Sequence, residues 1–241
     1  GHNIKNLVEV FQRAKVTQMP VLIHVQTKKG KGYRPAERFP HLYHGVSPAA
    51  SRSQGKKESF SSVFGQTLAQ LARQDRRICA ISAAMTEATG LDAFRQDPQL
   101  RPRLFDVGMA EAHGLTFACG LAIDGFLPVF AVYSTFLQRA YDQMLHDASI
   151  VPRHVILAVD RAGIVGEDGA THQGVFDIPM ISSLPGSVIY SPANYEELKI
   201  QLKQAIYEET GLAAVRYPRG GEDVSVRFEH PEEPVSLREK K

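Results

Sequence analysis

From residue 60 onward, short apolar runs of strand length alternate with segments of helical periodicity. The strand-length runs are ICAISA, RLFDVG, PVFAVY, HVILAVD, SVIYSP and LAAVRYP. The helical segments are SSVFGQTLAQLARQ, LDAFRQ, AEAHGLTFACGLAIDG, TFLQRAYDQMLHDAS and NYEELKIQLKQAIYEE. Because parallel strands need a long crossover, usually a helix, this alternation predicts an α/β fold. We expect residues 60–220 to form a doubly wound, mostly parallel sheet with helices on both faces.

The segments on either side of this region have a different pattern. Residues 1–27 contain one helical segment, over residues 4–14, and one strand-like run, PVLIHVQT, which are too little for a domain. We expect them to be a detached remnant of a preceding domain. Residues 28–59 are rich in Gly, Pro, Ser and charge without a sustained period, which predicts an interdomain linker. Residues 221–241 are polar and Pro-containing, which predicts a linker toward a further domain.

Composition and charge narrow the function classes. The 241 residues are 43% hydrophobic and 22% charged, with a formal net charge of +2, so no basic surface indicates a nucleic acid or an anionic membrane. No apolar run reaches the length of a membrane span. Cys79 and Cys119 lie in apolar stretches, which is typical of reduced, buried thiols and favours a cytoplasmic location.

Chemically active side chains follow several predicted strands. They are Glu111, His113, Tyr133, Phe136, Arg139, Arg161, Asp168, His172 and Arg219. Considered singly, each residue can be explained by structure without a function: Glu111 can interact with a helix dipole, Phe136 can belong to the core, and Arg161 can pair with Asp160. Ligands of such sheets bind at the carboxyl ends of the strands, so the coincidence at several strand ends favours a ligand site.

Four motifs resemble a known family. FDVGMAEAHGLTFACGLA, YSTFLQRAYDQMLHD, DRAGIVGEDGATHQGVFD and VRYPRG are similar to segments of the 1-deoxy-D-xylulose-5-phosphate synthases, which are thiamine-diphosphate enzymes of the transketolase superfamily. The similarity includes TKKGKGYRPAE and YHGV and extends from Gly1 to about Gly221. It implies that residues 60–220 are a pyrimidine-binding domain and that residues 1–27 end a diphosphate-binding domain.

The resemblance implies an activity and a cofactor site. The reaction is the condensation of pyruvate with D-glyceraldehyde 3-phosphate, with loss of carbon dioxide, to 1-deoxy-D-xylulose 5-phosphate, a precursor of isoprenoids, thiamine and pyridoxal. The family enzyme is expected to be a homodimer. Glu111 matches the catalytic glutamate that hydrogen-bonds N1′ of the aminopyrimidine, Phe136 matches the residue that packs on that ring, and Tyr33 matches a cofactor contact.

The resemblance also implies residues for the acceptor. Arg161 and Arg219 match phosphate-binding arginines, whose forked donors suit phosphate oxygens. The residues that match other acceptor contacts are Tyr133, Arg139 and Asp168. His172 and His44 match histidines that transfer protons or orient the intermediate, whereas His113 is expected to have a structural role.

Two departures from the family pattern bear on these expectations. The Gly-Asp-Gly motif and downstream Asn that bind Mg²⁺ do not occur, so we assign no metal ligand and expect those of Mg²⁺ to lie outside this chain. Ala112 and Gly114 stand where a glutamine and an alanine are expected. Since Glu111 is retained, we interpret these two differences as sequence variation near the site rather than lost function. Because the Mg²⁺ ligands are expected to lie elsewhere, we expect these residues alone to be inactive. The alternatives are a subunit of a split transketolase-like or 2-oxoacid dehydrogenase enzyme, and a non-catalytic fragment.

Overall fold

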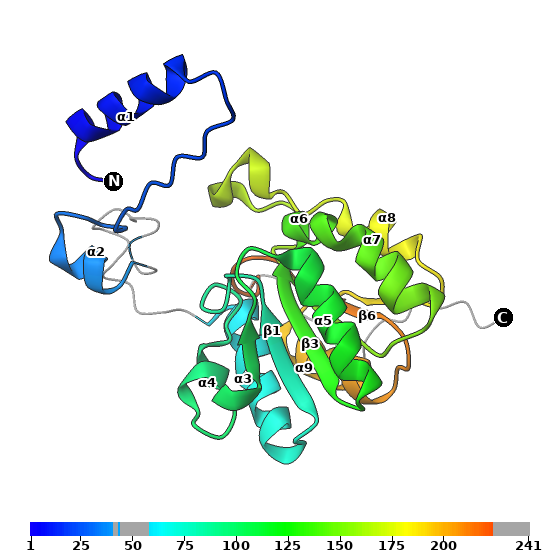
Figure 1. The fold of residues 1–241 in the computed structure, drawn as a ribbon. Helices are drawn as coiled ribbons and strands as arrows, with labels where there is room; N and C mark the ends of the chain where they lie inside the picture. Colours follow the sequence, from blue (N-terminus) through cyan, green and yellow to red (C-terminus); the bar gives the residue numbers. More distant parts are fainter. Residues whose placement is uncertain (41–42, 44–57, 224–241) are drawn as a thin grey trace. The chain divides into compact units, whose positions relative to one another are not determined.

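The computed structural model describes residues 1–40, 43 and 58–223 (Figure 1). The chain divides into two compact units, Gly1–Lys56 and Lys57–Lys241. Within the described residues, no helix combines the length and apolar character needed to span a membrane.

The described residues of the first unit form two helices, α1 (Ile4–Val16) and α2 (Arg34–Arg38). The side chain of Asn3 caps α1 by accepting the backbone N–H of Asn6, and no residue of α1 is buried. The predicted strand PVLIHVQT is wrong, because no strand is assigned to residues 20–27 and Leu22 is 95% exposed. A strand needs a hydrogen-bonded neighbour, and the described residues of this unit provide none.

Residues 58–223 of the second unit are built on one six-stranded sheet. Its strands are β1 (Ile78–Ser82), β2 (Leu104–Asp106), β3 (Leu127–Tyr133), β4 (Ile156–Asp160), β5 (Val188–Tyr190) and β6 (Ala213–Arg216). Their order is β2-β1-β3-β4-β6-β5, and every neighbouring pair is parallel. The predicted parallel α/β architecture is confirmed.

Helices cover both faces of the sheet. They are α3 (Phe60–Gln74), α4 (Asp92–Gln96), α5 (Glu111–Ile123), α6 (Ser134–Leu137), α7 (Tyr141–Gln143), α8 (Asp177–Ser182) and α9 (Tyr195–Tyr207). Alternate strand residues enter two separate cores: Val129 lies in the core that includes α3 and α9, whereas Phe130 lies in the core that includes α5, α6 and α8. This alternation is what period-2 side chains require in a sheet buried on both faces.

The segment after β3 is less regular than predicted. A continuous helix was expected from TFLQRAYDQMLHDAS, but a 3₁₀ turn at Gln138–Ala140 separates α6 from α7, and a π-helical stretch, Met144–Ile150, follows. The Ser149 hydroxyl donates to the carbonyl of Met144 at 2.8 Å, five residues earlier. A 3₁₀ turn changes the direction of side chains relative to a regular helix, and Arg139 stands in the turn Gln138–Ala140.

Candidate active site at the carboxyl edge of the sheet

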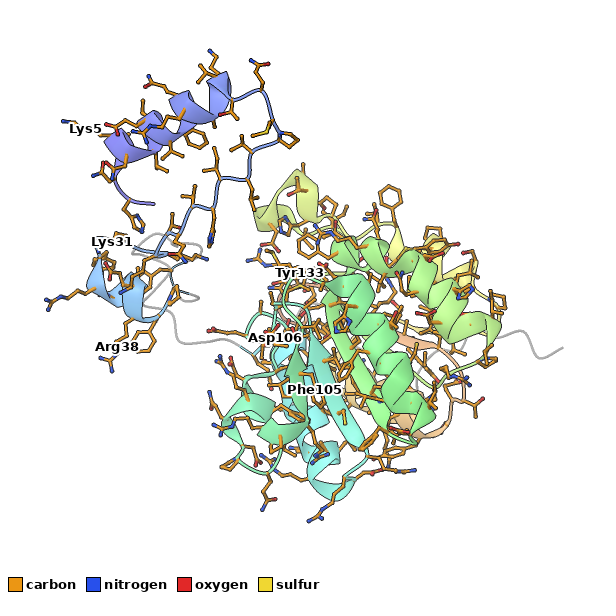
Figure 2. All side chains as sticks on the ribbon, in the orientation of Figure 1. Lys5, Lys31, Arg38, Phe105, Asp106 and Tyr133 are labelled. Atoms are coloured by element: carbon orange, nitrogen blue, oxygen red, sulfur yellow. The ribbon has the colours of Figure 1, made fainter. Side chains whose placement is uncertain are left out.

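The predicted site residues of the second unit follow the carboxyl ends of its strands. The strand order reverses between β1 and β3, which makes this edge the topological switch point where α/β sheets bind ligands. Asp106 pairs in register with Ser82, and Ser82 with Ala131, so β1, β2 and β3 end at the same edge (Figure 2). Glu111 follows β2, Tyr133 ends β3 and Arg161 follows β4.

Glu111 is a buried carboxylate at the first position of α5, where only 4% of its side chain is exposed. Its Oε1 accepts a hydrogen bond from Nη1 of Arg139 at 2.5 Å. The amino end of a helix favours negative charge, which adds to the effect of the arginine. The site therefore holds a shielded acidic group with one charged partner on a neighbouring element.

Phe136 lies among aromatic and cationic groups. The guanidinium carbon of Arg139 is 4.7 Å from the centroid of its ring, and the ring of Tyr133 stacks nearly parallel to it at 5.7 Å. His172 approaches edge-on, with ring centroids 5.3 Å apart. Since Arg139 contacts both Glu111 and Phe136, the carboxylate and the aromatic ring border the same space.

Arg161 is held at the end of β4 in a left-handed conformation, with φ of 58°. Its backbone N–H donates to Oδ1 of Asp160 at 2.7 Å, and its Nη1 lies 3.0 Å from Oδ2 of the same carboxylate. Nη1 also donates to the carbonyl of Ala88 at 2.8 Å, and Ser61 donates to Asp160. This pairing was anticipated as the structural role of Arg161, and it positions a guanidinium of which 13% is exposed.

Asp168 lies between two arginines. Its Oδ2 is 3.7 Å from Nε of Arg161 and 3.4 Å from Nε of Arg219. Neither contact is a hydrogen bond. Both Asp168 Oδ2 and Arg161 Nε are buried, and neither atom has a hydrogen-bond partner among the described residues. Buried polar atoms of this kind need a partner such as a ligand or an ordered water.

Burial raises the pKa of two groups at this site. Burial raises the pKa of Tyr133 to about 12, although Arg161 acts to lower it. Burial also raises the pKa of Asp160, while Arg161 opposes that change. At neutral pH Tyr133 therefore remains a neutral hydroxyl that can donate a hydrogen bond.

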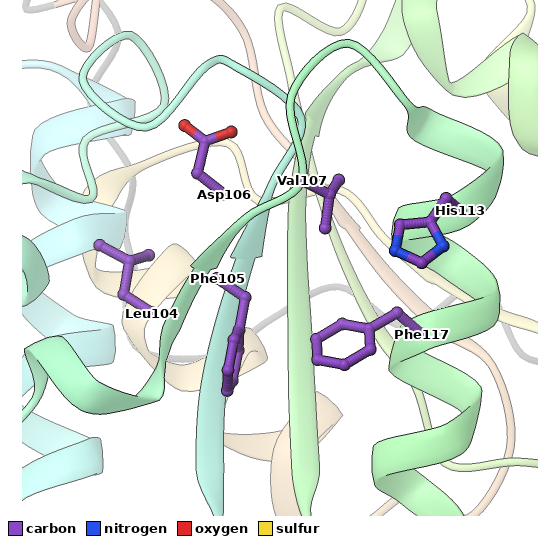
Figure 3. Close-up of a pocket in the computed structure, with 6 residues that line it drawn as sticks. All are labelled: Leu104, Phe105, Asp106, Val107, His113 and Phe117. Atoms are coloured by element: carbon purple, nitrogen blue, oxygen red, sulfur yellow. The ribbon is translucent and has the colours of Figure 1, made fainter.

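A separate pocket of about 460 Å³ lies beside β2 and α5 (Figure 3). It is lined by Leu104, Phe105, Asp106, Val107, His113 and Phe117. His113 stacks on Phe117 with centroids 6.1 Å apart, and Asp106 accepts hydrogen bonds from Ala84, Gly108 and Thr86. None of the residues predicted to act on a ligand lines this pocket, so it is distinct from the site around Glu111 and Arg161.

Two predicted site residues are not placed in this cluster. Tyr33 belongs to the first unit, where its ring meets that of Tyr43 edge-on at 5.5 Å. Glu37 accepts the N–H of Gly32 and pairs with Lys28, which fixes the glycine-rich turn before Tyr33. His44 lies outside the described residues.

Sequence reasoning missed some residues that shape the site. Ser61 contributes a hydroxyl from the first turn of α3, and Ala88 contributes a backbone carbonyl from the loop after β1. Tyr217, which follows β6, is fully buried and stacks on Phe64 at 5.5 Å. Backbone acceptors and distant serines carry no motif, and Tyr217 lies within the motif VRYPRG but was not assigned a role.

Residues 56–221 match the family described as "Transketolase, pyrimidine binding domain". The chain is 52% identical over 225 residues to a 1-deoxy-D-xylulose-5-phosphate synthase of Desulforudis audaxviator, which covers 91% of this chain and 35% of that protein. It is 50% identical over 226 residues to "1-deoxy-D-xylulose-5-phosphate synthase 1" of Geobacter sulfurreducens, with coverage of 91% and 35%. The chain thus spans about a third of the length of these relatives.

Solved structures share the fold. A transketolase from Leishmania mexicana superposes with a TM-score of 0.60 at 18% identity, covering 81% of this chain and 32% of that one. A "split gene transketolase, inactive beta4 tetramer" superposes with a TM-score of 0.58 at 23% identity, covering 72% and 56%. At this identity the likeness shows the arrangement of the sheet and helices alone.

Proposed function

The chain belongs to the family of transketolase pyrimidine-binding domains, and from that premise we propose that it forms part of a 1-deoxy-D-xylulose-5-phosphate synthase. The proposed reaction joins pyruvate to D-glyceraldehyde 3-phosphate with loss of carbon dioxide. About 50% identity to proteins of that name supports this choice. Residues 60–220 are proposed to be the pyrimidine-binding domain, residues 1–27 the end of a diphosphate-binding domain, and residues 28–59 and 221–241 linkers.

The observation that carries the proposal is the pairing of a buried carboxylate with an aromatic ring. Glu111 and Phe136 come from segments after different strands, and both contact Arg139. An aminopyrimidine needs a carboxyl group at a ring nitrogen and a flat apolar surface for its face, so the residues present fit thiamine diphosphate. When bound, that cofactor supplies an electron-withdrawing thiazolium carbon that stabilises the charge left by decarboxylation.

In the proposed mechanism, Glu111 holds a proton at the pyrimidine nitrogen. A carboxyl group within hydrogen-bond reach of a ring nitrogen can hold or pass on a proton there. Phe136 orients the ring by stacking, and Tyr33 is proposed as a further contact. We propose that Mg²⁺ accompanies the diphosphate; in the described part of the chain no cluster of three His, Cys, Asp or Glu could hold it, and its ligands are proposed to lie elsewhere.

The acceptor is proposed to bind between Arg161 and Arg219. Both guanidinium groups approach the Asp168 carboxylate, and their forked donors suit the oxygens of a phosphate. Arg161 Nε, which makes no hydrogen bond, is a donor that a phosphate oxygen can use. Asp168, Tyr133 and Arg139 are proposed to contact the acceptor, while His172 and His44 assist proton transfer.

The test is reconstitution of the reaction in the full-length protein. With thiamine diphosphate, Mg²⁺, pyruvate and D-glyceraldehyde 3-phosphate, we expect equal amounts of carbon dioxide and 1-deoxy-D-xylulose 5-phosphate. We propose that the enzyme is a cytoplasmic homodimer, which light scattering and fractionation would check. Ketol transfer between sugar phosphates without pyruvate consumption would instead favour the split transketolase alternative.

A further inference from the structure

The guanidinium of Arg139 occupies the two groups that the proposed function assigns to the cofactor ring. Its Nη1 donates to Oε1 of Glu111 at 2.5 Å, and its central carbon lies 4.7 Å from the centroid of the Phe136 ring. A hydrogen bond to the carboxylate and a planar contact with the aromatic ring are the interactions proposed for the aminopyrimidine. Arg139 therefore already makes both of them.

The chemistry of the two groups is similar enough for one to replace the other. A guanidinium is planar and delocalised, carries N–H donors on its edge and stacks on aromatic rings. A protonated aminopyrimidine is also planar and presents N–H donors on its edge. With Arg139 in place, only 4% of the Glu111 side chain is exposed, so little of the carboxylate remains open to a second partner. Binding of the ring to Glu111 and Phe136 thus requires Arg139 to move.

Two features allow the Arg139 side chain to move. It stands on the 3₁₀ turn Gln138–Ala140, and 58% of its side chain is exposed, in contrast with the 13% of Arg161. A long side chain that is largely exposed can rotate into solvent without opening the core. By contrast, Glu111 on α5 and Phe136 on α6 are fixed by helices packed on the sheet.

We propose that Arg139 is an internal competitor for the pyrimidine position. This inference rests on the proposed function and goes beyond it. In the empty site Arg139 pairs with the Glu111 carboxylate, which would otherwise be a buried charge without a partner, and it shields the Phe136 ring. Cofactor binding displaces Arg139 from both contacts and leaves it at the rim, where it can meet the acceptor. This competition lowers the apparent affinity for the cofactor, because only those molecules in which Arg139 has left Glu111 and Phe136 can bind it.

The test is equilibrium binding of the cofactor without substrates. In the full-length protein, Arg139→Met keeps most of the side-chain length but removes the charge and the donors. We expect isothermal titration calorimetry with thiamine diphosphate and Mg²⁺ to give a Kd that is lower by about three- to tenfold. The sign is informative, because loss of a positive charge would otherwise weaken binding of an anionic cofactor. Arg139→Lys, which keeps the charge but loses the planar fork, should fall between the two.

Two comparisons make the result specific. Arg95→Met removes another partly exposed arginine that pairs with a carboxylate, Asp92 at 2.6 Å, and should leave the Kd unchanged. In a Glu111→Gln background, Arg139→Met should give little further gain, because the neutral amide binds the guanidinium weakly. An unchanged or higher Kd for Arg139→Met would overturn the competition while leaving the proposed function in place. Absence of cofactor binding in the wild-type protein would overturn both.

Discussion

The guanidinium carbon of Arg161 lies 4.1 Å from the centroid of the Tyr133 ring, so the end of β4 is joined to the end of β3 by a cation–π contact. The same guanidinium pairs with Asp160, whose side chain is completely buried. Arg161 is therefore both a structural cation and a proposed phosphate ligand. Asp168 lies near both Arg161 and Arg219. Arg219 follows β6, and 33% of its side chain is exposed.

Because Arg161 also supports the fold, Arg219 is the better residue with which to test phosphate binding. In the full-length protein, Arg219→Ala should lower kcat/KM for D-glyceraldehyde 3-phosphate at least about tenfold, because a charge-assisted hydrogen bond contributes about 1.5–3 kcal/mol. Use of unphosphorylated glyceraldehyde and binding of pyruvate should change little. Arg95→Ala serves as the control. An equal loss for both acceptors would remove Arg219 from the phosphate site.

Arg161→Ala should have two effects. It should weaken use of the phosphorylated acceptor, and it should also destabilise the fold by about 3–5 kcal/mol, because the buried Asp160 loses its cation. Chemical denaturation followed by circular dichroism separates this effect from the change in kcat/KM. A variant that loses the phosphate preference without any loss of stability would show that Arg161 does not support Asp160.

Glu111 should be essential for activation of the cofactor. Replacement by Ala or Gln in the full-length protein should lower turnover by about two to four orders of magnitude, as expected for a group that acts in proton transfer. The direct measurement is hydrogen–deuterium exchange at the thiazolium carbon of bound thiamine diphosphate. Glu196→Gln, on the exposed start of α9, is a matched control. Exchange at the wild-type rate in Glu111→Gln would contradict the assignment.

The sheet and its helices were predictable because their signals are local. Strand-length apolar runs separated by helical segments led to the six strands of the described residues. The helical segment NYEELKIQLKQAIYEE led to α9, which Asn194 caps by accepting the N–H of Glu197. The grouping of Glu111, Phe136 and Arg161 also followed, since parallel strands end at one edge. Periodicity and chain order carry this information without knowledge of tertiary contacts.

The features that were not predicted depend on tertiary contacts, which cannot be read from the sequence. PVLIHVQT has strand-like composition, yet it forms no strand without a neighbour to pair with. The break of the helix after β3 depends on a slip in hydrogen-bond register, so the contact of Arg139 with Glu111 could not be predicted from a regular helix. α8 has six residues and contains Pro179, which leaves too short a pattern to recognise.

The two cysteines should be unreactive in the folded protein. Burial, with a contribution from Asp147, raises the pKa of Cys119 from its ordinary 9.0 to about 11, and burial also raises the pKa of Cys79. Because the thiolate is the reactive form, we expect slow labelling by a thiol reagent at pH 8 and rapid labelling after denaturation. Mass spectrometry of the labelled peptides would identify each site. Fast native labelling of Cys119 would contradict its burial.

The same shift has a consequence for stability. A pKa that is higher in the folded state than in the unfolded state contributes stability below the unfolded value, and this contribution is lost as the pH rises through the folded value. For Cys119 the window lies between pH 9.0 and about 11. Cys119→Ala should therefore show a shallower fall in the free energy of unfolding across this window than the wild-type protein does. Parallel curves would show that Cys119 does not contribute to the dependence.

The close approach of Gly65 and Gly90 links the fold to the acceptor site. A Cβ added to Gly65 on α3 would lie 1.8 Å from the carbonyl oxygen of Gly90, and Gly90 itself has φ of 80°. Since backbone rather than a flexible side chain must then move, Gly65→Ala should destabilise the protein by about 3 kcal/mol. The displaced loop carries Ala88, whose carbonyl accepts from Arg161, so use of the phosphorylated acceptor should also weaken.

Gly120 provides the matched control for this substitution. It also lies inside a helix, α5, but a Cβ added there would meet nothing within 4 Å. Gly120→Ala should therefore stabilise the protein by about 0.5–1 kcal/mol, because alanine loses less conformational freedom in a helix than glycine does. Urea denaturation of the two variants should give changes of opposite sign. Similar stability for both would mean that α3 and the loop after β1 can separate at little cost, and Ala88 would then not fix the position of Arg161.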